Sequence, residues 1–422
     1  MELTKVIKRK LKNNSKKLLN NIIFLFIGIS GALLIRILRP FILIRIGSLV
    51  GSRIGHFALN TELYICEKIN KINTPKSRYM DFFYLDPENN RPICNKNLLK
   101  LWLRTIKIYP AWLLSPVDRV NHFIQSKSYQ INAPIQSDRD IFNLIDKTPF
   151  THLALTREEE IHGSAVLRKM GIPENKKFVC LIARDSAYLP MHLGGNLSDY
   201  EYHDYRDVDI GDYLFAAKKI AEMGYFVIRM GVKVHKKLPR IHSNIIDYAE
   251  SEFRSEFMDI YLGAKCFFCI SNGVGFDAIP YIYRRPIAYT NMVPFNCFAS
   301  FGSQNIGIFK HHVELLTNKK LSIKESQRLG VFSATSSMDY LEKNIFLHNN
   351  TQEEIFDLCE EMILRLNGDW IEQDAAQERQ KKFWECYVDA SSKTQRNGQP
   401  LHGEVKAKIG EKFLKQNNYL ME

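Results

Sequence analysis

Hydrophobic and polar positions in residues 177–290 follow two periods, one typical of buried strands and one typical of amphipathic helices. Short apolar runs predict strands over residues 178–183, 225–230, 245–248, 266–271 and 286–290. Apolar residues spaced by three and four predict helices over residues 210–223, 253–263 and 275–283. Strands that alternate with helices at this spacing indicate a parallel sheet with helical crossovers.

The same alternation occurs earlier in the chain, and helical patterns follow it. The pattern predicts strands over residues 41–46 and 80–85, and helices over residues 57–69, 98–108, 157–170, 352–366 and 374–387. Gly171 and Pro173 end one of these helices and mark a boundary. The sequence therefore predicts an α/β fold of two doubly wound, Rossmann-like domains, over residues 39–173 and 174–370. The C-terminal helices, over residues 371–422, are expected to pack back across both domains.

Residues 22–35 form an uncharged apolar run that Arg36 and Arg39 follow. A membrane span needs about 20 apolar residues, and this run is shorter. It is therefore open to three interpretations: a helix in the membrane interface, a span that continues toward residue 44, or a buried core helix. The first is favoured, because a span with a cytoplasmic basic terminus would place the rest of the chain outside the cell.

The formal net charge of +12 is concentrated near the N-terminus. Seven lysines and arginines against one glutamate give 7 − 1 = +6 before residue 18. A nucleic-acid-binding protein would spread such charge over its folded surface, so no nucleic-acid partner is expected. A basic arm beside an apolar run indicates attraction to anionic lipid. Residues 1–38 are therefore predicted to attach the chain to the cytoplasmic face of the inner membrane.

Two short motifs have the spacing of metal ligands. Cys266 and Cys269 form a C-x-x-C, but they lie inside a predicted strand, and core packing is the favoured interpretation. The eight cysteines are scattered through apolar runs, as in reduced cytosolic proteins. Asp207 and Asp209 form a D-x-D pair, which is expected to serve a helix start instead. We therefore predict neither a metal ion nor a cofactor.

The polar segment over residues 271–280 leaves a predicted buried strand and enters a helix. Gly273 and Gly275 would allow unusual backbone angles and the close approach of a ligand. Free N–H groups at the start of the helix would favour an anion. Three side chains could contact phosphate or ribose: Ser271, Asn272 and Asp277. Asp277 could instead cap the helix, and the segment could be a turn without a ligand.

A second polar segment over residues 203–207 follows a strand that ends near Arg184. Arg184 and Arg206 suit paired phosphate oxygens, and His203 could donate to phosphate or act as an acid or base. Arg229 ends a neighbouring predicted strand and would point at the same edge of the sheet. The alternative is a solvated loop with surface ion pairs.

In the first domain, the glycine-spaced segment over residues 51–62 would face the second domain. His56 is the candidate general base, because its free pKa lies near neutrality. Glu62 is a second catalytic candidate, and Arg53 and Asn60 could position an acceptor. A histidine at a helix start can also be a cap or a packing residue.

Five ordered segments resemble a family of glycosyltransferases encoded in bacterial surface-polysaccharide gene clusters: residues 51–62, 184–188, 203–209, 225–231 and 255–280. The resemblance implies a GT-B-like arrangement, with an acceptor domain first, a nucleotide-sugar domain second and no obligatory metal. It implies that residues 271–280 form the donor-phosphate turn, but it transfers no role to Arg184, His203 or Arg206. Ile182 stands where similar enzymes often carry a histidine, two residues before the arginine.

The residues and the resemblance together predict a metal-independent transferase. Its partners would be a nucleotide-sugar donor, a glycan or lipid-linked acceptor and an anionic membrane surface. Two alternatives remain open: an epimerase or pyruvyl transferase on the same fold, and a membrane-bound nucleotide-binding module without catalytic activity.

Overall fold

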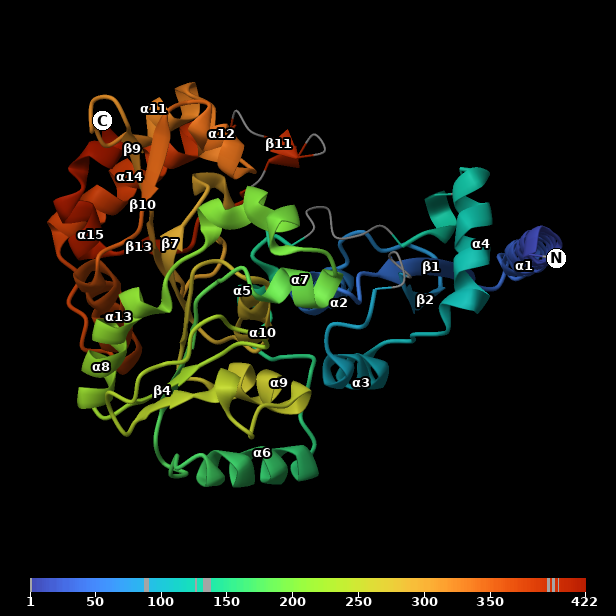
Figure 1. The fold of residues 1–422 in the computed structure, drawn as a ribbon, viewed down its shortest axis with the longest axis horizontal. Helices are drawn as coiled ribbons and strands as arrows, with labels where there is room; N and C mark the ends of the chain where they lie inside the picture. The colour runs from blue at the N-terminus through green and yellow to red at the C-terminus, as the bar shows by residue number, and fades with distance from the viewer. Residues whose placement is uncertain are drawn as a thin grey trace.

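The structure is a computed structural model that describes residues 2–86, 91–125, 127–131, 138–392, 395–396, 399–400 and 402–422. Its centre is a parallel sheet of seven strands (Figure 1). In spatial order these are β13 (Lys408–Ile409), β8 (Ile306–Phe309), β7 (Ile287–Met292), β6 (Cys269–Ser271), β3 (Phe178–Ile182), β4 (Phe226–Arg229) and β5 (Ile245–Asp247). The central strands are buried along almost their whole length, as continuous apolar runs in parallel sheets predict.

Helices cover both faces of this sheet. The helices α8 (Leu214–Glu222) and α13 (Gln352–Asn367) pack together on one face, and α9 (Glu256–Lys265) and α10 (Ala278–Ile282) pack together on the other (Figure 1). Their starts follow from local sequence. Thr351 and Glu354 form a capping box at α13, and the Ser255 hydroxyl accepts from the Met258 N–H at α9.

The order of the strands contains a reversal. From β3 the chain proceeds to β4 and β5 toward one edge, whereas from β6 it proceeds to β7 and β8 toward the other edge. The reversal therefore lies between β3 and β6, which are hydrogen-bonded neighbours. In open parallel sheets, ligands bind beyond the C-terminal ends of the two strands that flank such a point. The fold therefore indicates that a ligand would contact the segments that follow Ile182 and Ser271.

The N-terminal unit has a smaller sheet than the sequence predicts. The strands β1 (Leu43–Leu49) and β2 (Tyr79–Leu85) pair in parallel, and isolated bridges at Gln130 and Ile108 extend the pair on either side. The segment after β2 instead forms two helices, α3 (Lys96–Thr105) and α4 (Ala111–Phe123). The α/β class is confirmed, but the first sheet is limited to these strands because its chain length goes into helices.

The helix α2 (Ile54–Ile69) connects β1 to the rest of the molecule. It begins three residues before the predicted start, so that Ile54, Gly55 and His56 belong to its first turn. Its buried face packs against α10, and so it joins the N-terminal unit to the seven-stranded sheet.

The N-terminal helix α1 (Glu2–Ile37) projects from the body together with α4 (Figure 1). Only 17% of its apolar window over Leu18–Ile37 is buried, so the interpretation as a buried core helix is wrong. Arg36 and Arg39 follow the apolar run in the sequence. One side of α1 packs on α4, and most of the rest is exposed.

The C-terminal segment completes the sheet. The helices α14 (Asp374–Ser392) and α15 (Glu411–Gln416) flank α13 and the edge strand β13. The Asn143 side chain of the N-terminal unit donates to the Glu404 carbonyl over 3.1 Å. The C-terminal segment therefore contacts both units, although its helices lie mainly on the larger one.

A buried ion pair joins the two N-terminal strands and provides a test of this part of the fold. Arg45 Nε and Nη2 donate to the two carboxylate oxygens of Asp81 over 2.7 and 2.8 Å. Asp81→Ala would leave a buried guanidinium without its partner, so we expect urea unfolding to show a loss of about 3–5 kcal/mol. The control Glu174→Ala removes an exposed pair with Arg168 and should change stability by about 0–1 kcal/mol. Equal losses in both variants would contradict this account.

Candidate functional site

The side chain of Asn272 joins the segments that leave β3 and β6. Its Oδ1 accepts from the Arg184 N–H, and its Nδ2 donates to the Arg206 carbonyl, both over 2.8 Å. Asn272 is 3% exposed, so both bonds are shielded from water. The amide therefore holds Arg184 and Arg206 together at the reversal of strand order.

Four cationic or titratable side chains gather around this point. Arg184 Nη1 contacts Asp207 Oδ1 at 2.7 Å, whereas Arg206 Nη2 donates to the uncharged Gly273 carbonyl. Burial and the nearby charges of Arg184, Arg206 and Arg53 together lower the pKa of His203 to about 4. We call Arg53, Arg184, His203 and Arg206 the cation cluster.

Three of these residues were predicted to bind the donor, and the structure brings them together. Arg53 was assigned to the acceptor side, yet its charge acts on His203 across the domain junction. His203 and Arg206 lie on a 3-10 helix over Leu197–Arg206, where the sequence predicted a loop. The three arginines supply the positive charge of this cluster, and Asp207 balances part of it, so the arrangement suits a diphosphate.

Lys310 is a further cation that the sequence analysis did not identify. It follows β8, is 4% exposed, and its Nζ donates to the Tyr205 and Asp207 carbonyls over 3.0 and 2.9 Å. Burial lowers its pKa to about 8. Lys310 therefore binds the backbone on both sides of Arg206 and fixes this segment. The signal was a lysine directly after an apolar run, in a stretch for which no strand was predicted.

The turn after β6 uses its own side chains to hold its amides. Ser271 Oγ accepts from the Gly273 N–H over 3.1 Å, and Asp277 Oδ2 accepts from the Val274 N–H over 3.0 Å. Ser271 also donates to Asp277 and is fully buried. Side chains therefore already bind these two amides, which precede the helical turn, whereas the predicted anion site at the amides of the helix start stays a prediction. Asp277 acts as the cap that was weighed as its alternative, and burial raises its pKa to about 7.

The two glycines of this turn have different roles. Gly273 has φ +80°, the left-handed conformation that was predicted. Gly275 instead makes room for protein: a Cβ there would lie 3.3 Å from the Gly55 backbone nitrogen, and one on Gly55 would lie 3.1 Å from the Gly275 Cα. Gly275 therefore admits the start of α2, and the close approach predicted for a ligand is made by Gly55.

This contact places His56 beside the turn. His56 is half-buried in the first turn of α2, directly after Gly55, and Arg53 precedes the helix and is exposed. The helix α7 (Tyr188–Leu193) braces the same segment, because His192 Nε2 and the Ser52 carbonyl lie 2.7 Å apart in a hydrogen bond. The helix start that carries His56, the candidate general base, therefore packs against the turn beside which the cation cluster gathers.

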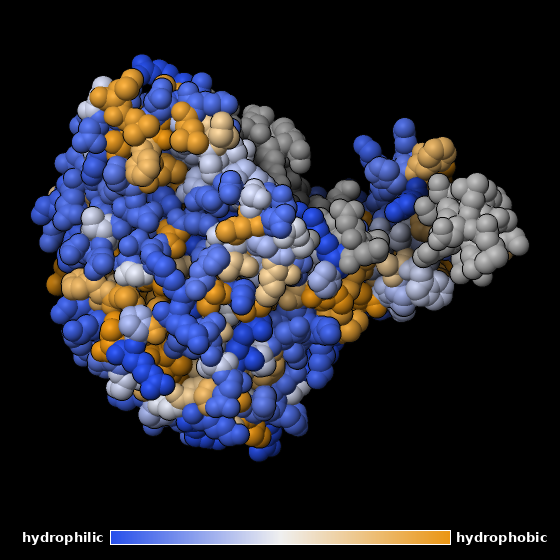
Figure 2. Space-filling model, in the orientation of Figure 1, coloured by the Kyte–Doolittle hydropathy of each residue, from blue (hydrophilic) through white to orange (hydrophobic). Residues whose placement is uncertain are grey.

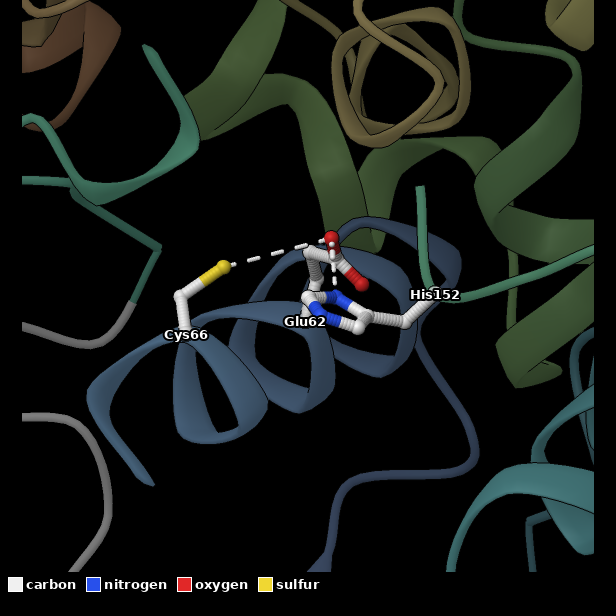
Figure 3. Close-up of side chains that lie close together, drawn as sticks. All are labelled: Glu62, Cys66 and His152. Atoms are coloured by element: carbon white, nitrogen blue, oxygen red, sulfur yellow. Dashed lines mark hydrogen bonds and ion pairs between the residues drawn. The ribbon is translucent and has the colours of Figure 1, made fainter. Parts of the chain in front are cut away.

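Glu62 lies two turns further along α2 and is fully buried. Its Oε1 accepts from Arg284 Nη1 over 2.6 Å and lies 2.9 Å from His152 Nδ1 (Figure 3). A residue that is sealed from solvent by an ion pair cannot contact a substrate, so its assignment as catalytic is wrong. Its role is to tie α2 to Arg284, at the end of α10.

Glu62, Cys66 and His152 also have donor atoms within 4.8 Å of one another, a spacing that could hold a metal ion (Figure 3). The guanidinium of Arg284 already contacts one carboxylate oxygen of Glu62 and supplies positive charge there. Burial raises the pKa of the Cys66 thiol to about 12, which opposes the thiolate that metals bind. These residues therefore fit a buried ion pair better than a metal site.

Two further candidates lie outside the junction. Arg229 is 2% exposed, and it donates to Asp247 over 2.9 Å and to the Lys236 carbonyl over 3.1 Å, so it holds β4 to β5. Its assignment to phosphate binding is wrong, because its guanidinium turns to the adjacent strand. Asn60 accepts from the Asp138 N–H over 2.6 Å and so anchors the chain there.

The two metal-like motifs have structural roles. Asp209 accepts from the Gly211 N–H over 2.8 Å and so caps a short helix, as predicted. Its D-x-D partner Asp207 binds Arg184, and burial raises the pKa of Asp207 to about 6. Cys266 and Cys269 are both buried in the core, as expected.

The contact between Gly55 and Gly275 can be tested directly. Gly55→Val would force a branched side chain against the turn, and overpacking of this kind costs about 1–3 kcal/mol. We expect hydrogen–deuterium exchange to increase in residues 54–60 and 273–282, and Gly55→Ala to have a smaller effect. Unchanged exchange in the valine variant would show that the two backbones are not pressed together.

No protein-family model matches the sequence, and no curated protein matches it. Among solved structures, the chain is similar to a glycosyltransferase family 9 protein from Veillonella parvula DSM 2008. The two are 10% identical, with 76% of this chain and 97% of that chain covered and a TM-score of 0.43. It is also similar to the ADP-heptose lps heptosyltransferase II of E. coli, at 11% identity, with 77% and 100% covered and a TM-score of 0.38. These likenesses concern general architecture and assign no activity to this chain.

Proposed function

We propose that this chain is a glycosyltransferase that binds the diphosphate of a nucleotide-sugar donor at the cation cluster. The observation that carries the proposal is the position of Arg184, His203 and Arg206 at the reversal between β3 and β6, where the start of α2 meets the second domain. Parallel sheets bind ligands at this place, and the cluster supplies the charge that a diphosphate requires.

Arg206 is the main donor-binding residue in this proposal. The charge of Arg184 is partly balanced by Asp207, whereas Arg206 is held by a neutral carbonyl and keeps its charge for a ligand. As the bond between sugar and diphosphate breaks, negative charge grows on the leaving nucleoside diphosphate. Fixed cations lower the energy of that state without having to reorganise, and we propose that they act without a metal ion.

The first domain would hold the acceptor. His56 would take the proton of the acceptor hydroxyl, whose oxygen then bonds to the anomeric carbon as the diphosphate leaves. Glu62 would act only by positioning, since its ion pair with Arg284 fixes α2 against the second domain. We further propose that the reaction serves surface-polysaccharide synthesis at the cytoplasmic face of the inner membrane, with a lipid-linked acceptor.

Nucleotide binding tests the donor site. Arg206→Ala should weaken the binding of nucleoside diphosphates by about 10- to 100-fold, since a charge-assisted hydrogen bond contributes about 1.5–3 kcal/mol. Titration calorimetry with ADP, CDP, GDP and UDP measures the effect. The control Arg168→Ala changes an exposed arginine on the helix α6 (Arg157–Lys169) and should bind as the unchanged protein does. If all four nucleotides bind both variants alike, the donor site lies elsewhere. If none of them binds the unchanged protein, the proposed donor binding is contradicted.

Transfer to an acceptor tests the base. His56→Ala should lower the transfer rate by about 10²- to 10⁴-fold while donor binding stays constant, because a general base acts only on the chemical step. The exposed His162 on α6 gives the control His162→Ala, which should retain full transfer. Near-normal transfer by His56→Ala would remove this residue from the mechanism. Conversion of the nucleotide sugar without any acceptor would favour the epimerase alternative.

A further inference from the structure

The apolar segment of α1 exposes a continuous hydrophobic surface. Its window over Leu18–Ile37 is long and apolar enough to cross a membrane, yet little of it is buried in the protein. Six of its side chains are between 53% and 71% exposed: Leu25, Phe26, Ile29, Leu33, Leu34 and Ile37. Large contiguous apolar patches are rarely exposed on soluble proteins, and they indicate contact with a membrane or another protein.

The helix α4, which packs on α1, also exposes large apolar side chains, which the sequence analysis did not identify. Trp112 and Phe123 are 67% and 87% exposed. They lie eleven positions apart, which is about three helical turns, so they share one face of α4. Phe41, just after the end of α1, is 78% exposed as well. Figure 2 shows the larger body as mainly hydrophilic on this side, and Figure 1 shows α1 and α4 projecting from it.

The two helices form a fixed pair. A Cβ on Gly28 would lie 2.8 Å from the Pro116 carbonyl oxygen, and one on Gly31 would lie 2.4 Å from a Val117 methyl group, so the glycines permit close packing. Arg36 Nη1 donates to Asn121 Oδ1 over 2.9 Å and locks the end of α1 to α4. One stripe of α1 is therefore covered by protein, and the other side is open.

This packing opposes a perpendicular span. If α1 crossed a bilayer, α4 would be carried into the hydrocarbon together with its polar residues Asp118 and Arg119. Charged groups at that depth are costly, and Asp118 is already committed to the Tyr84 hydroxyl at 2.8 Å. A helix pair that lies flat keeps these groups at headgroup level while the open side of α1 enters the acyl region.

Charge identifies the partner as an anionic lipid surface. The arm before residue 18 carries a formal charge of +6 and continues directly into the apolar segment of α1. Arg39 and Arg119 are exposed at the same projection. Each basic residue near an anionic leaflet contributes about 1 kcal/mol to attraction, whereas a protein partner would not require this excess.

We propose that α1 and α4 form one platform that lies flat in an anionic leaflet, with Trp112 and Phe123 inserted beside α1. The platform keeps the N-terminus and the body on the same side of the membrane. This inference does not depend on sugar transfer, and it holds or fails independently of the proposed reaction.

Vesicle flotation tests the contribution of α4. The full chain should float with phosphatidylcholine vesicles that contain phosphatidylglycerol and bind phosphatidylcholine alone more weakly. The double variant Trp112→Ser/Phe123→Ser should lower partitioning by about tenfold or more, because two apolar side chains leave the lipid. The control Leu316→Ser/Ile371→Ser changes residues of similar exposure, 85% and 83%, on the other domain and should float normally. Equal partitioning of both double variants would overturn the role of α4, and no flotation with either lipid would overturn the lipid surface as partner.

Trypsin digestion of sealed membrane vesicles tests the orientation. Lysines of the arm and lysines of the body provide cleavage sites at both ends of the platform. A flat platform leaves both on one side, so they should be cleaved together or protected together. Cleavage of only the arm or only the body would show that α1 crosses the membrane and would overturn the proposal.

Discussion

The packing of α2 against the turn after β6 determines where every proposed functional residue lies. Gly55 and Gly275 meet backbone to backbone, which side chains at either position would prevent. The pair of Glu62 and Arg284 lies further along the same helix and fixes its direction. If the two partners of a buried ion pair separate, each leaves a buried charge without compensation, which is strongly destabilising. The pair therefore holds the helix in place even where it adds little net stability. Arg53 and His56 therefore belong to one helix start that packs against this turn.

Polar side chains at this junction divide into those that build the site and those that face it. The framework consists of side chains that bond to backbone groups of the protein: Ser271, Asn272, Asp277 and Lys310. Arg206 and His203 are left as the groups oriented by this framework. Removal of a framework residue should therefore alter both the position of the arginines and the stability of the protein. Removal of a residue that only contacts the ligand should leave both unchanged.

The sequence predicted five strands of the larger sheet, β3 to β7, because buried parallel strands are continuous apolar runs bounded by glycine and polar residues, but it missed β8 and β13. It also placed Arg184, His203 and Arg206 at one edge of the sheet, and the structure brings them together, whereas their role in donor binding stays a prediction. It could not show which side chains turn inward. Glu62 is sealed by Arg284, which lies 222 positions away, and Arg229 by Asp247 on the next strand. The role of α4 was hidden for the same reason: its exposure depends on what α1 covers.

The strand β1 lies between the helices α1 and α4 and the start of α2, and under the proposed function this spacing would bear on the choice of acceptor. It begins six residues after α1 ends, and its seven residues make it roughly 23 Å long at the usual rise per residue. Its pairing with β2 along its whole length makes it a stiff spacer. If α1 rests in the leaflet, the reacting hydroxyl of a membrane-bound acceptor has to reach across a span that this spacer sets. The fold would then discriminate between acceptors by reach, and favour glycans that have already grown beyond their first sugars.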